Sequence, residues 1–406
     1  MVSWDGMTFD EFTLKTGEMS AQLPPKRYAD AFLTPEAVRR NAAAAMLRPS
    51  CLNELLDEAA RVRGDETLTA LAALLHWVFF EDAAGPGLDD IPFPASLADE
   101  GERGAFCLLV ALGYPDVFAR LNRARGIPDD VIADTILQIG CYDSAFQLVH
   151  GRAGIFPRQL ARLHASMPPR RFFRIGRLEF IQIEFAREFV VYRNRGDGRT
   201  VAFCTAGIPF LPDGRLCPTD RPPPQNVLMT ALSEDDGRIA GNGIDENARV
   251  DVAQTVLEGN EWECALRPGD PVLALHIPEG GGLTPERVDD AMERALPFFD
   301  RHFPGNGLKG VYCHSWILSP QLRECLPPES NILAFQRKVH LLPATPNAGC
   351  DRGLWFLFRS YPPYDDPAAL PRDTSMQRAV AEWLERGNSF CAGSMYVLRP
   401  LPPTRG

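Results

Sequence analysis

Two periodicities divide the chain. Between about residues 35 and 165 apolar residues recur at three- and four-residue spacing, whereas after Pro168 and Pro169 apolar and polar residues alternate. The first spacing is typical of amphipathic helices and the second of β-strands. The helical stretches are PEAVRRNAAAAML, CLNELLDEAARVR, ETLTALAALLHWVFF, ERGAFCLLVAL, PDVFARLNRA and PDDVIADTILQIGCYDSAFQLV. The pattern predicts an all-helical N-terminal domain over 1–166 and a second domain over 167–406.

The second domain begins with a run of predicted strands. RFFRIGRLEFIQIEF, EFVVYRN and RTVAFC alternate, and the glycine-bearing turn RGDG separates the last two, so we expect an antiparallel meander. Residues 205–245 are rich in glycine, proline and aspartate, which predicts loops and a mobile flap over the sheet. ARVDVAQTVL and the two halves of WECALRPGDPVLALHIP predict three further strands.

A well-marked helix follows the last of these strands. The strand is expected to end at Pro278, Gly280–Gly282 form a turn, Thr284 is placed to cap a helix and Pro285 takes its first position. Pro297 is expected to end or kink this helix, because proline disfavours helical geometry at the residue before it.

The remaining elements complete an α+β domain. LKGVYCHSW and LWFLFRSY predict strands, SPQLRECL a short helix, and TSMQRAVAEWLERG a final helix with a threonine cap and a glycine after its end. We expect a mixed, mainly antiparallel sheet with flanking helices.

Composition narrows the class of protein. The 406-residue chain is 45% hydrophobic and 23% charged with a net charge of −11, which is typical of a globular protein and disfavours nucleic acid or an anionic membrane as a partner. The first residues lack the pattern of a secretory signal, and no apolar run reaches the roughly 18 residues of a membrane span. The ten cysteines form no C-x-x-C pair, so we expect reduced thiols, no metal site and a cytoplasmic location.

Four arginines lie close together in the sequence at the start of the second domain. Arg170, Arg171, Arg174 and Arg177 lie close together in PPRRFFRIGR, either as a solvated entrance to a strand or as a local anion site. The Gly280–Gly282 turn offers a second anion site, because free backbone N–H groups and the helix dipole meet where a strand passes through glycines into a helix. The alternative is a plain connector.

Several motifs resemble one family. The segments GNGIDENARV and LHIP, the C-x-S-W of Cys313 and Trp316, SNIL-x-F-Q at 330–336 and T-x-x-Q-R-A at 374–379 resemble a GNAT-like C-terminal domain. In some bacterial proteins that domain follows a helical N-acyltransferase N-terminal domain, and the likeness covers most of this chain. The resemblance implies a two-domain, acyl-coenzyme-A-dependent N-acyltransferase with a small-molecule amine as acceptor.

The same resemblance implies a cofactor site. GNAT enzymes hold the pantetheine arm along a central strand and the pyrophosphate on the loop that opens the next helix. The matching residues here are Leu275, Ile277, Gly280, Gly281, Gly282, Leu283 and Thr284. Pro278 and Glu279 precede the glycines, where the superfamily usually has glutamine or arginine and two spaced glycines.

Histidines are the candidate bases, since acyl transfer to an amine needs a proton acceptor and a proton donor. His276 closes the presumed cofactor strand and His314 lies near the end of the next, so we expect both to face one cleft. The alternative for His276 is a satisfied core histidine. Tyr312 and Ser315 are candidate acids or orienting groups, although the superfamily's frequent tyrosine is absent from the following helix.

Other polar residues keep two interpretations. Cys313 is either an acyl-accepting nucleophile or a buried thiol, and the second is favoured because the neighbouring His314 points to the opposite face of a regular strand. Glu179 and Glu184 either contact a substrate amine or face solvent. His76 lies in an apolar helix, where a core role is favoured.

Two functions therefore stay open. The first is the N-acyltransferase, and the second is a non-catalytic ligand-binding or regulatory protein on a degenerate GNAT scaffold. The chain contains no G-x-S-x-G, Walker or H-E-x-x-H motif, so it lacks the usual signatures of serine hydrolases, P-loop nucleotide hydrolases and zincins. The sequence leaves the acceptor, the acyl chain and the oligomeric state undetermined.

Overall fold

The computed structural model describes residues 25–81, 93–217, 222, 225–235, 237–343, 353–359, 364–388 and 390–400. The chain forms two compact units, one of residues 1–181 and 277–281 and the other of residues 182–276 and 282–406. The segment tested for a secretory signal, parts of the expected flap and Cys350 lie outside the described residues. The domain boundary expected between residues 166 and 167 stays a prediction.

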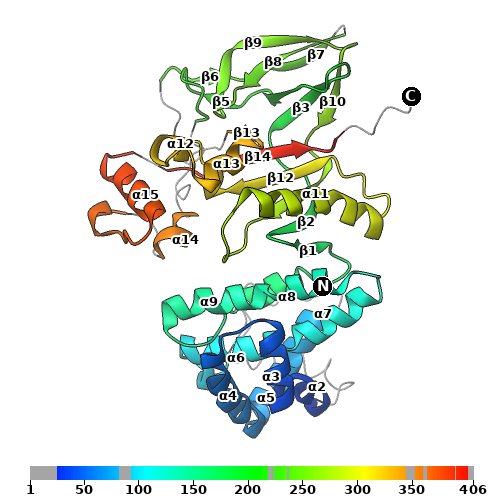
Figure 1. The fold of residues 1–406 in the computed structure, drawn as a ribbon, viewed down its shortest axis with the longest axis vertical. Helices are drawn as coiled ribbons and strands as arrows, with labels where there is room; N and C mark the ends of the chain where they lie inside the picture. The colour runs from blue at the N-terminus through cyan, green and yellow to red at the C-terminus, as the bar shows by residue number, and fades with distance from the viewer. Residues whose placement is uncertain are drawn as a thin grey trace. The chain divides into compact units, whose positions relative to one another are not determined.

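The first unit is mainly helical, as its periodicity predicts. Its α-helices in chain order are α2 (Pro25–Leu33), α3 (Pro35–Ala44), α4 (Leu52–Gly64), α5 (Glu66–His76), α6 (Glu100–Ala111), α7 (Tyr114–Arg123), α8 (Asp129–Ile136), α9 (Gln138–His150) and α10 (Arg158–His164) (Figure 1). Side-chain caps fix several starts: Thr34 accepts from the N–H of Ala37, and Asp99 accepts from that of Glu102.

Helix α6 is the centre of this unit. Residues Ala105–Ala111 are all buried, and the run Glu100–Arg123 is long and apolar enough by composition to cross a membrane. Because 78% of that window is buried within the protein, it behaves as a core helix and is weak evidence for a span. His76 is also buried and stacks on Phe32 with ring centroids 4.5 Å apart, which confirms its core interpretation.

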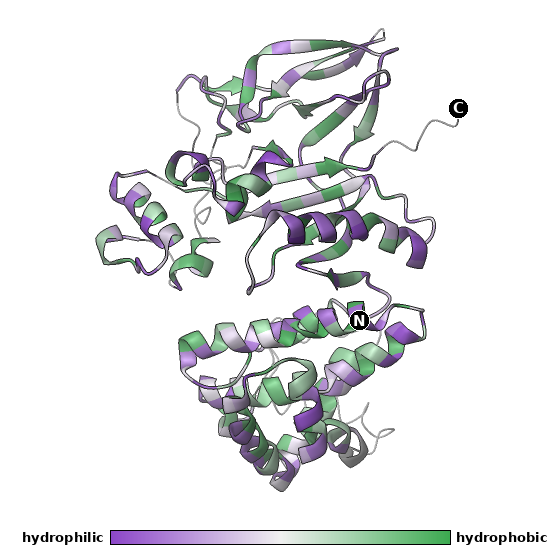
Figure 2. Cartoon of the chain, in the orientation of Figure 1, coloured by the Kyte–Doolittle hydropathy of each residue, from purple (hydrophilic) through white to green (hydrophobic). Residues whose placement is uncertain are grey.

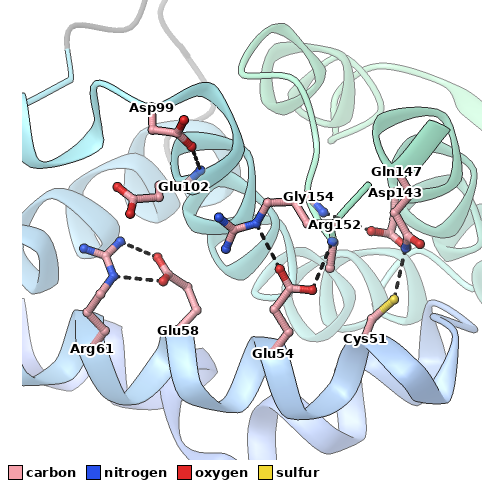
Figure 3. Close-up of polar contacts among 11 residues, drawn as sticks. Cys51, Glu54, Glu58, Arg61, Asp99, Glu102, Asp143, Gln147, Arg152 and Gly154 are labelled. Atoms are coloured by element: carbon pink, nitrogen blue, oxygen red, sulfur yellow. Dashed lines mark hydrogen bonds and ion pairs between the residues drawn. The ribbon is translucent and has the colours of Figure 1, made fainter. Parts of the chain in front are cut away.

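Carboxylates join α4 to the segment that follows α9 (Figure 3). Glu54 accepts from Arg152 Nε at 2.9 Å and from the N–H of Ala153 at 3.3 Å. The buried Asp143 accepts from the N–H of Gly154 at 3.0 Å and from the Gln147 amide. Burial raises the pKa of Asp143, and these hydrogen bonds oppose that rise. The network is a structural link, since its carboxylates already have partners inside the unit.

The strands form two large sheets. The first has the order β1-β2-β11-β12-β14-β13, and the second has the path β10-β3-β4-β8-β7 with β9 paired to β8. The bounds for the first sheet are β1 (Phe172–Ile175), β2 (Leu178–Glu184), β11 (Pro271–His276), β12 (Gly310–Ser315), β13 (His340–Leu342) and β14 (Gly393–Leu398). Those for the second are β3 (Phe189–Asn194), β4 (Thr200–Cys204), β7 (Leu232–Asp235), β8 (Arg238–Ile244), β9 (Val250–Glu258) and β10 (Trp262–Leu266).

One expectation about strand pairing is wrong, and the region expected to be loops contains strands. Strands β1 and β2 form one antiparallel pair, and β3 and β4 form another, but the two pairs belong to different sheets rather than to one meander. The expected flap contains the β7–β8 hairpin and the short strands β5 (Pro209–Phe210) and β6 (Leu228–Met229). In the second unit an apolar core that includes Phe189, Val191, Tyr312 and Tyr396 joins strands of both sheets.

Helix α11 (Pro285–His302) packs by one side only. Val288, Ala291, Ala295 and Phe299 are buried. Figure 2 shows the helix largely hydrophilic along the side turned to the viewer. The helix begins at Pro285 as predicted and continues through Pro297, so this proline does not end it, and a kink at this position stays a prediction. Apolar contacts along one face outweigh the hydrogen bond that proline removes.

The last third of the chain contains further corrections. LWFLFRSY was expected to form a strand, yet Trp355–Phe358 is the short helix α14, because its residues pack on one side of a small core with α12 (Leu322–Cys325) and α15 (Ser375–Glu385). Helix α13 (Asn331–Arg337) and strand β14 were not expected as separate elements. Together the helical unit and the mainly antiparallel mixed sheets confirm the α+β class.

The N-terminus of α15 gives a direct test of local sequence signals. Thr374 accepts from the N–H of Gln377 at 3.1 Å, and the Gln377 side chain accepts from the N–H of Thr374 at 2.9 Å. Thr374→Ala is expected to lower the free energy of unfolding by about 1 kcal/mol, because one N–H of the first turn loses its partner. Denaturant unfolding measures this loss, and Thr374→Ser should restore most of it.

Candidate functional site

Strands β11 and β12 are parallel neighbours that pair over a short length. Their register joins Leu273 to Val311 and Ala274 to Tyr312, and both strands are described throughout. Beyond this pairing β11 runs on to His276 and β12 to Ser315. On its other edge β12 stays paired with β14 as far as Ser315 and Gly393. The residue pairing between β11 and β12 therefore ends at Ala274 and Tyr312, before the ends of both strands.

A chain of polar side chains lies at this end of β12. Tyr312 and His314 share one face of the strand because they are two residues apart. The Tyr312 hydroxyl accepts from Arg187 Nε and lies 3.3 Å from Ser394 Oγ, while His314 Nδ1 lies 2.8 Å from the same oxygen. Ser394 lies opposite His314 in the β12–β14 register. The four residues form one hydrogen-bonded series.

The electrostatics favour a neutral imidazole beside a protonated phenol. Burial lowers the pKa of His314, and the positive charge of Arg187 lowers it further. Burial raises the pKa of Tyr312, and the hydrogen bonds from Ser394 and Arg187 oppose that rise. At neutral pH His314 can therefore accept a proton, and the Tyr312 hydroxyl keeps its own.

The end of β11 carries the other candidate base. Continuing the Leu273–Val311 register would bring His276 opposite His314, although the strands no longer pair there. The His276 side chain is exposed, so the alternative that it is a core histidine is wrong. Its role as a base stays a prediction, as does the acid or orienting role of the half-buried Ser315.

Cys313 has the properties of a structural thiol. It is 1% exposed, and burial raises its pKa to about 12. A thiol in that state is a weak nucleophile at neutral pH. The interpretation of Cys313 as a buried thiol is therefore confirmed.

The glycine turn has the backbone geometry expected of glycines. Gly280 and Gly281 adopt φ values of 89° and 57°, which side chains rarely allow, whereas Gly282 does not. A Cβ on Gly280 would meet nothing within 4 Å, and one on Gly282 would meet only Thr284 Cγ2 at 3.8 Å. The turn is thus open around the backbone. Whether Leu275, Ile277, Leu283 and the rest of the predicted cofactor set bind a ligand stays a prediction.

The N-terminus of α11 differs from the prediction in its capping. Thr284 occupies the N-cap position, but its side chain accepts no hydrogen bond from the first turn. The prediction of a side-chain cap at Thr284 is therefore wrong. The first backbone N–H groups of α11 keep the partial positive charge of a helix N-terminus, which suits a phosphate oxygen.

In the first unit, side chains anchor the segment 277–281. Arg177 Nε donates to the carbonyl of Gly281 at 3.1 Å, and Cys141 Sγ lies 3.6 Å from the carbonyl of Glu279. These contacts fix the backbone of the segment from one side. They also show that Arg177 is not simply a solvated residue at a strand entrance.

Of the two alternatives for Glu179, the one in which it faces solvent is wrong. It is 4% exposed and lies opposite Arg174 in the β1–β2 register, with no hydrogen-bond partner for Oε1. Burial raises its pKa to about 7, against the opposing charges of Arg174 and Arg177. Glu184, on the same strand, is exposed as expected.

Two members of the polar series escaped the sequence analysis. Ser394 lies on β14, which had not been predicted, and the alternation in SMYVL was the available signal. Arg187 lies between β2 and β3, where nothing in the local sequence marks it. Among the described residues, no group of three or more His, Cys, Asp or Glu side chains is arranged to hold a metal ion.

The arrangement defines a class of protein. A helical unit accompanies a mixed sheet in which two parallel strands stop pairing just before a glycine turn and a helix. Residues 172–396 match the model of the GNAT-like C-terminal domain family, and residues 39–160 match that of the N-acyltransferase N-terminal domain. The chain belongs to the GNAT-like C-terminal domain family.

Solved structures share this fold over nearly the whole chain. One is an acyltransferase in complex with decanoyl-CoA and teicoplanin, at 23% identity and TM-score 0.58, covering 89% of this chain and 88% of that one. Another is a mutant acyltransferase in complex with octanoyl-CoA, also at 23% identity and TM-score 0.58, covering 90% and 88%. No curated protein sequence matches this chain.

Proposed function

We propose that the protein is an acyl-CoA-dependent N-acyltransferase that transfers an acyl group from coenzyme A to the amine of a small molecule. The observation that carries the proposal is the end of the pairing between β11 and β12, with a neutral histidine beside it, in a member of the GNAT-like family. The acyl-CoA complexes of the structural neighbours support the choice of cofactor for this chain.

The residues of the site fit acyl-coenzyme A as co-substrate. The strand ends beyond the paired stretch of β11 and β12 suit the amide groups of a pantetheine arm, and the open turn at Gly280 and Gly282 suits a pyrophosphate. In the reaction the amine nitrogen forms a bond to the acyl carbon, the carbon–sulfur bond breaks, the amine proton passes to a base and the thiolate gains a proton. We assign the base role to His314, and the proton donor to Tyr312 or Ser315.

The cellular location of the protein is also a proposal. The nine described cysteines are all free thiols, which is consistent with a reducing compartment. We propose a cytoplasmic protein.

Calorimetric titration with coenzyme A, acetyl-CoA, octanoyl-CoA and decanoyl-CoA tests the proposal. Micromolar binding is expected, and Gly282→Val is expected to weaken it at least tenfold, because the new side chain occupies the open turn without backbone strain. Gly64→Val, at another open glycine outside the positive-φ region, is the matched control and should leave affinity unchanged.

Two results would count against the enzyme. Absence of binding by every thioester would remove acyl-coenzyme A as a ligand. Binding without turnover on a broad panel of amines would favour the non-catalytic scaffold.

A further inference from the structure

The second unit contains a cavity of about 530 Å³ to which no role has been assigned above. Its walls come from β4, the turn after β8, α12, α13, β13 and β14. The volume lies within the range of about 300–1,000 Å³ that is usual for small-molecule sites. The cavity is therefore large enough for a ligand of drug or metabolite size.

One wall is an aromatic stack. The Tyr396 ring is buried, and the His340 ring lies on it with centroids 4.9 Å apart and planes 13° apart. His340 is exposed although it lines the cavity, so the outer face of its ring is accessible. Partial burial of the ring lowers the pKa of His340, so the ring is neutral at pH 7. A flat, neutral ring with one open face suits a planar aromatic group.

Charges of both signs surround this stack. Arg323 is held by hydrogen bonds from Nε to Gln336 Oε1 at 3.1 Å and from Nη1 to the carbonyl of Glu246 at 2.9 Å. Gln336 is itself buried and donates to the carbonyls of Ile317 and Ser319 at 2.8 and 3.0 Å, so the guanidinium is firmly positioned.

Among the described residues, no ion pair neutralises the charge of Arg323. Across the described parts of the chain, neither Arg323 nor Arg337, a second lining residue, forms an ion pair with a carboxylate. Asp245 and Glu246 bring negative charge to the same lining. A ligand that carries both an anionic and a cationic group complements this lining better than a ligand with a single charge.

The cavity shares a sheet face with the polar series. In the pairing of β12, β14 and β13, Tyr396 lies opposite both Tyr312 and His340, and Ser394 lies opposite both His314 and Leu342. These pairings form two rows across the strands, one through Tyr396 and one through Ser394. The rows are two residues apart on each strand, so their side chains point to the same side of the sheet. Ser394 and His314 are therefore about 7 Å along the strands from the row that lines the cavity.

We propose that this cavity binds the acyl acceptor, and that the acceptor is an amino-acid-like molecule with a planar aromatic ring, a carboxylate and an amine. The ring stacks on His340, the carboxylate pairs with Arg323, and the amine lies on the side of Ser394 and His314. This assignment of the acceptor rests on the proposed N-acyltransferase function, whereas ligand binding by the cavity does not.

Calorimetry with L-tryptophan and L-phenylalanine, in the absence of coenzyme A, tests the cavity directly. Both are expected to bind, and 3-phenylpropionate and 2-phenylethylamine, which each lack one charged group, are expected to bind at least fivefold more weakly. His340→Ala and Arg323→Gln are each expected to weaken tryptophan binding at least fivefold. The control Arg294→Gln, at an exposed arginine of α11 that pairs with Asp290 at 3.1 Å, should have no effect.

A variant that fills the cavity tests the inference independently of His340 and Arg323. Leu333 is a buried lining residue, and Leu333→Trp should abolish binding of both amino acids. If that variant fails to fold, the surface change His340→Ala decides alone. Absence of binding by wild-type protein, or equal binding by wild type and His340→Ala, would overturn the inference.

The two proposals fail separately. Binding of acyl-CoA without binding of either amino acid removes this acceptor but leaves the acyltransferase. Binding of the amino acids at the cavity without binding of any acyl-CoA removes the acyltransferase but leaves the cavity as a ligand site.

Discussion

His314→Ala is expected to lower kcat by a factor of about 10²–10⁴ with little change in acyl-CoA affinity, because a positioned base contributes about that much to proton transfer. Three features support His314 over other candidates. Its Nδ1 is held by Ser394, burial and Arg187 keep it neutral, and it lies where β11 and β12 cease to pair. Steady-state kinetics on an accepted amine, together with calorimetry of acyl-CoA, measure both quantities.

The controls separate His314 from its neighbours. His302→Ala, a change at a half-buried histidine of the same unit that lies outside the polar series, should leave kcat unchanged. His276→Ala is expected to lower turnover more than affinity, but less than His314→Ala. If His276→Ala abolishes turnover while His314→Ala does not, the base is His276 and our assignment is wrong.

The pH dependence of kcat/KM is a second test of the role of His314. Because the pKa of His314 is lowered, its neutral form persists below the ordinary histidine range. The acid limb of kcat/KM should therefore fall at a pH below about 6.5. Ser394→Ala removes the partner of Nδ1 and is expected to lower kcat less than His314→Ala while shifting that limb. An unshifted limb would indicate that Ser394 only fills space.

Glu179→Gln is expected to change how stability depends on pH. In the native protein the pKa of Glu179 is raised from 4.5 to about 7 by burial. Between these values the unfolded chain releases a proton that the folded chain retains, so wild-type stability falls as pH rises through this window. The variant lacks this effect. Its stability relative to wild type should therefore rise by roughly 3 kcal/mol between pH 4 and pH 8.

His76 has the opposite dependence and masks the contribution of Glu179 only when the wild-type protein is measured alone. Burial lowers its pKa from 6.5 to about 4, so wild-type stability falls as pH decreases through that range. The two windows overlap, and the slopes partly cancel in the wild-type protein. Denaturant titrations of wild type, Glu179→Gln and His76→Leu from pH 4 to pH 8 separate them.

A matched change tests whether burial is the cause. Glu184→Gln, at the exposed end of the same strand, should leave the stability difference from wild type independent of pH. The idea fails if Glu179→Gln and wild type keep a constant stability difference over the whole range.

Local signals in the sequence determined the helices, most strands and several boundaries. The period of apolar residues is a property of each segment, and a cap such as Thr374 with Gln377 acts within one turn, so both can be recognised from neighbouring residues. The same holds for the strand, glycine turn and helix around Gly280–Pro285. The resemblance to GNAT-like domains rested on short motifs such as LHIP and T-x-x-Q-R-A and is confirmed by the family match.

Pairings between distant segments were decided only by the tertiary structure. The placement of β2 and β3 in different sheets, the insertion of β14 between β12 and β13, and the burial of Glu179 depend on partners far away in sequence. Short apolar runs such as LWFLFRSY fit either a strand or a helix until their packing partners are known. The histidine His314 was found from sequence, but Ser394, which holds its ring, lies 80 residues away and was not. Side-chain neighbours across a sheet follow from strand order and register, and no local pattern encodes these.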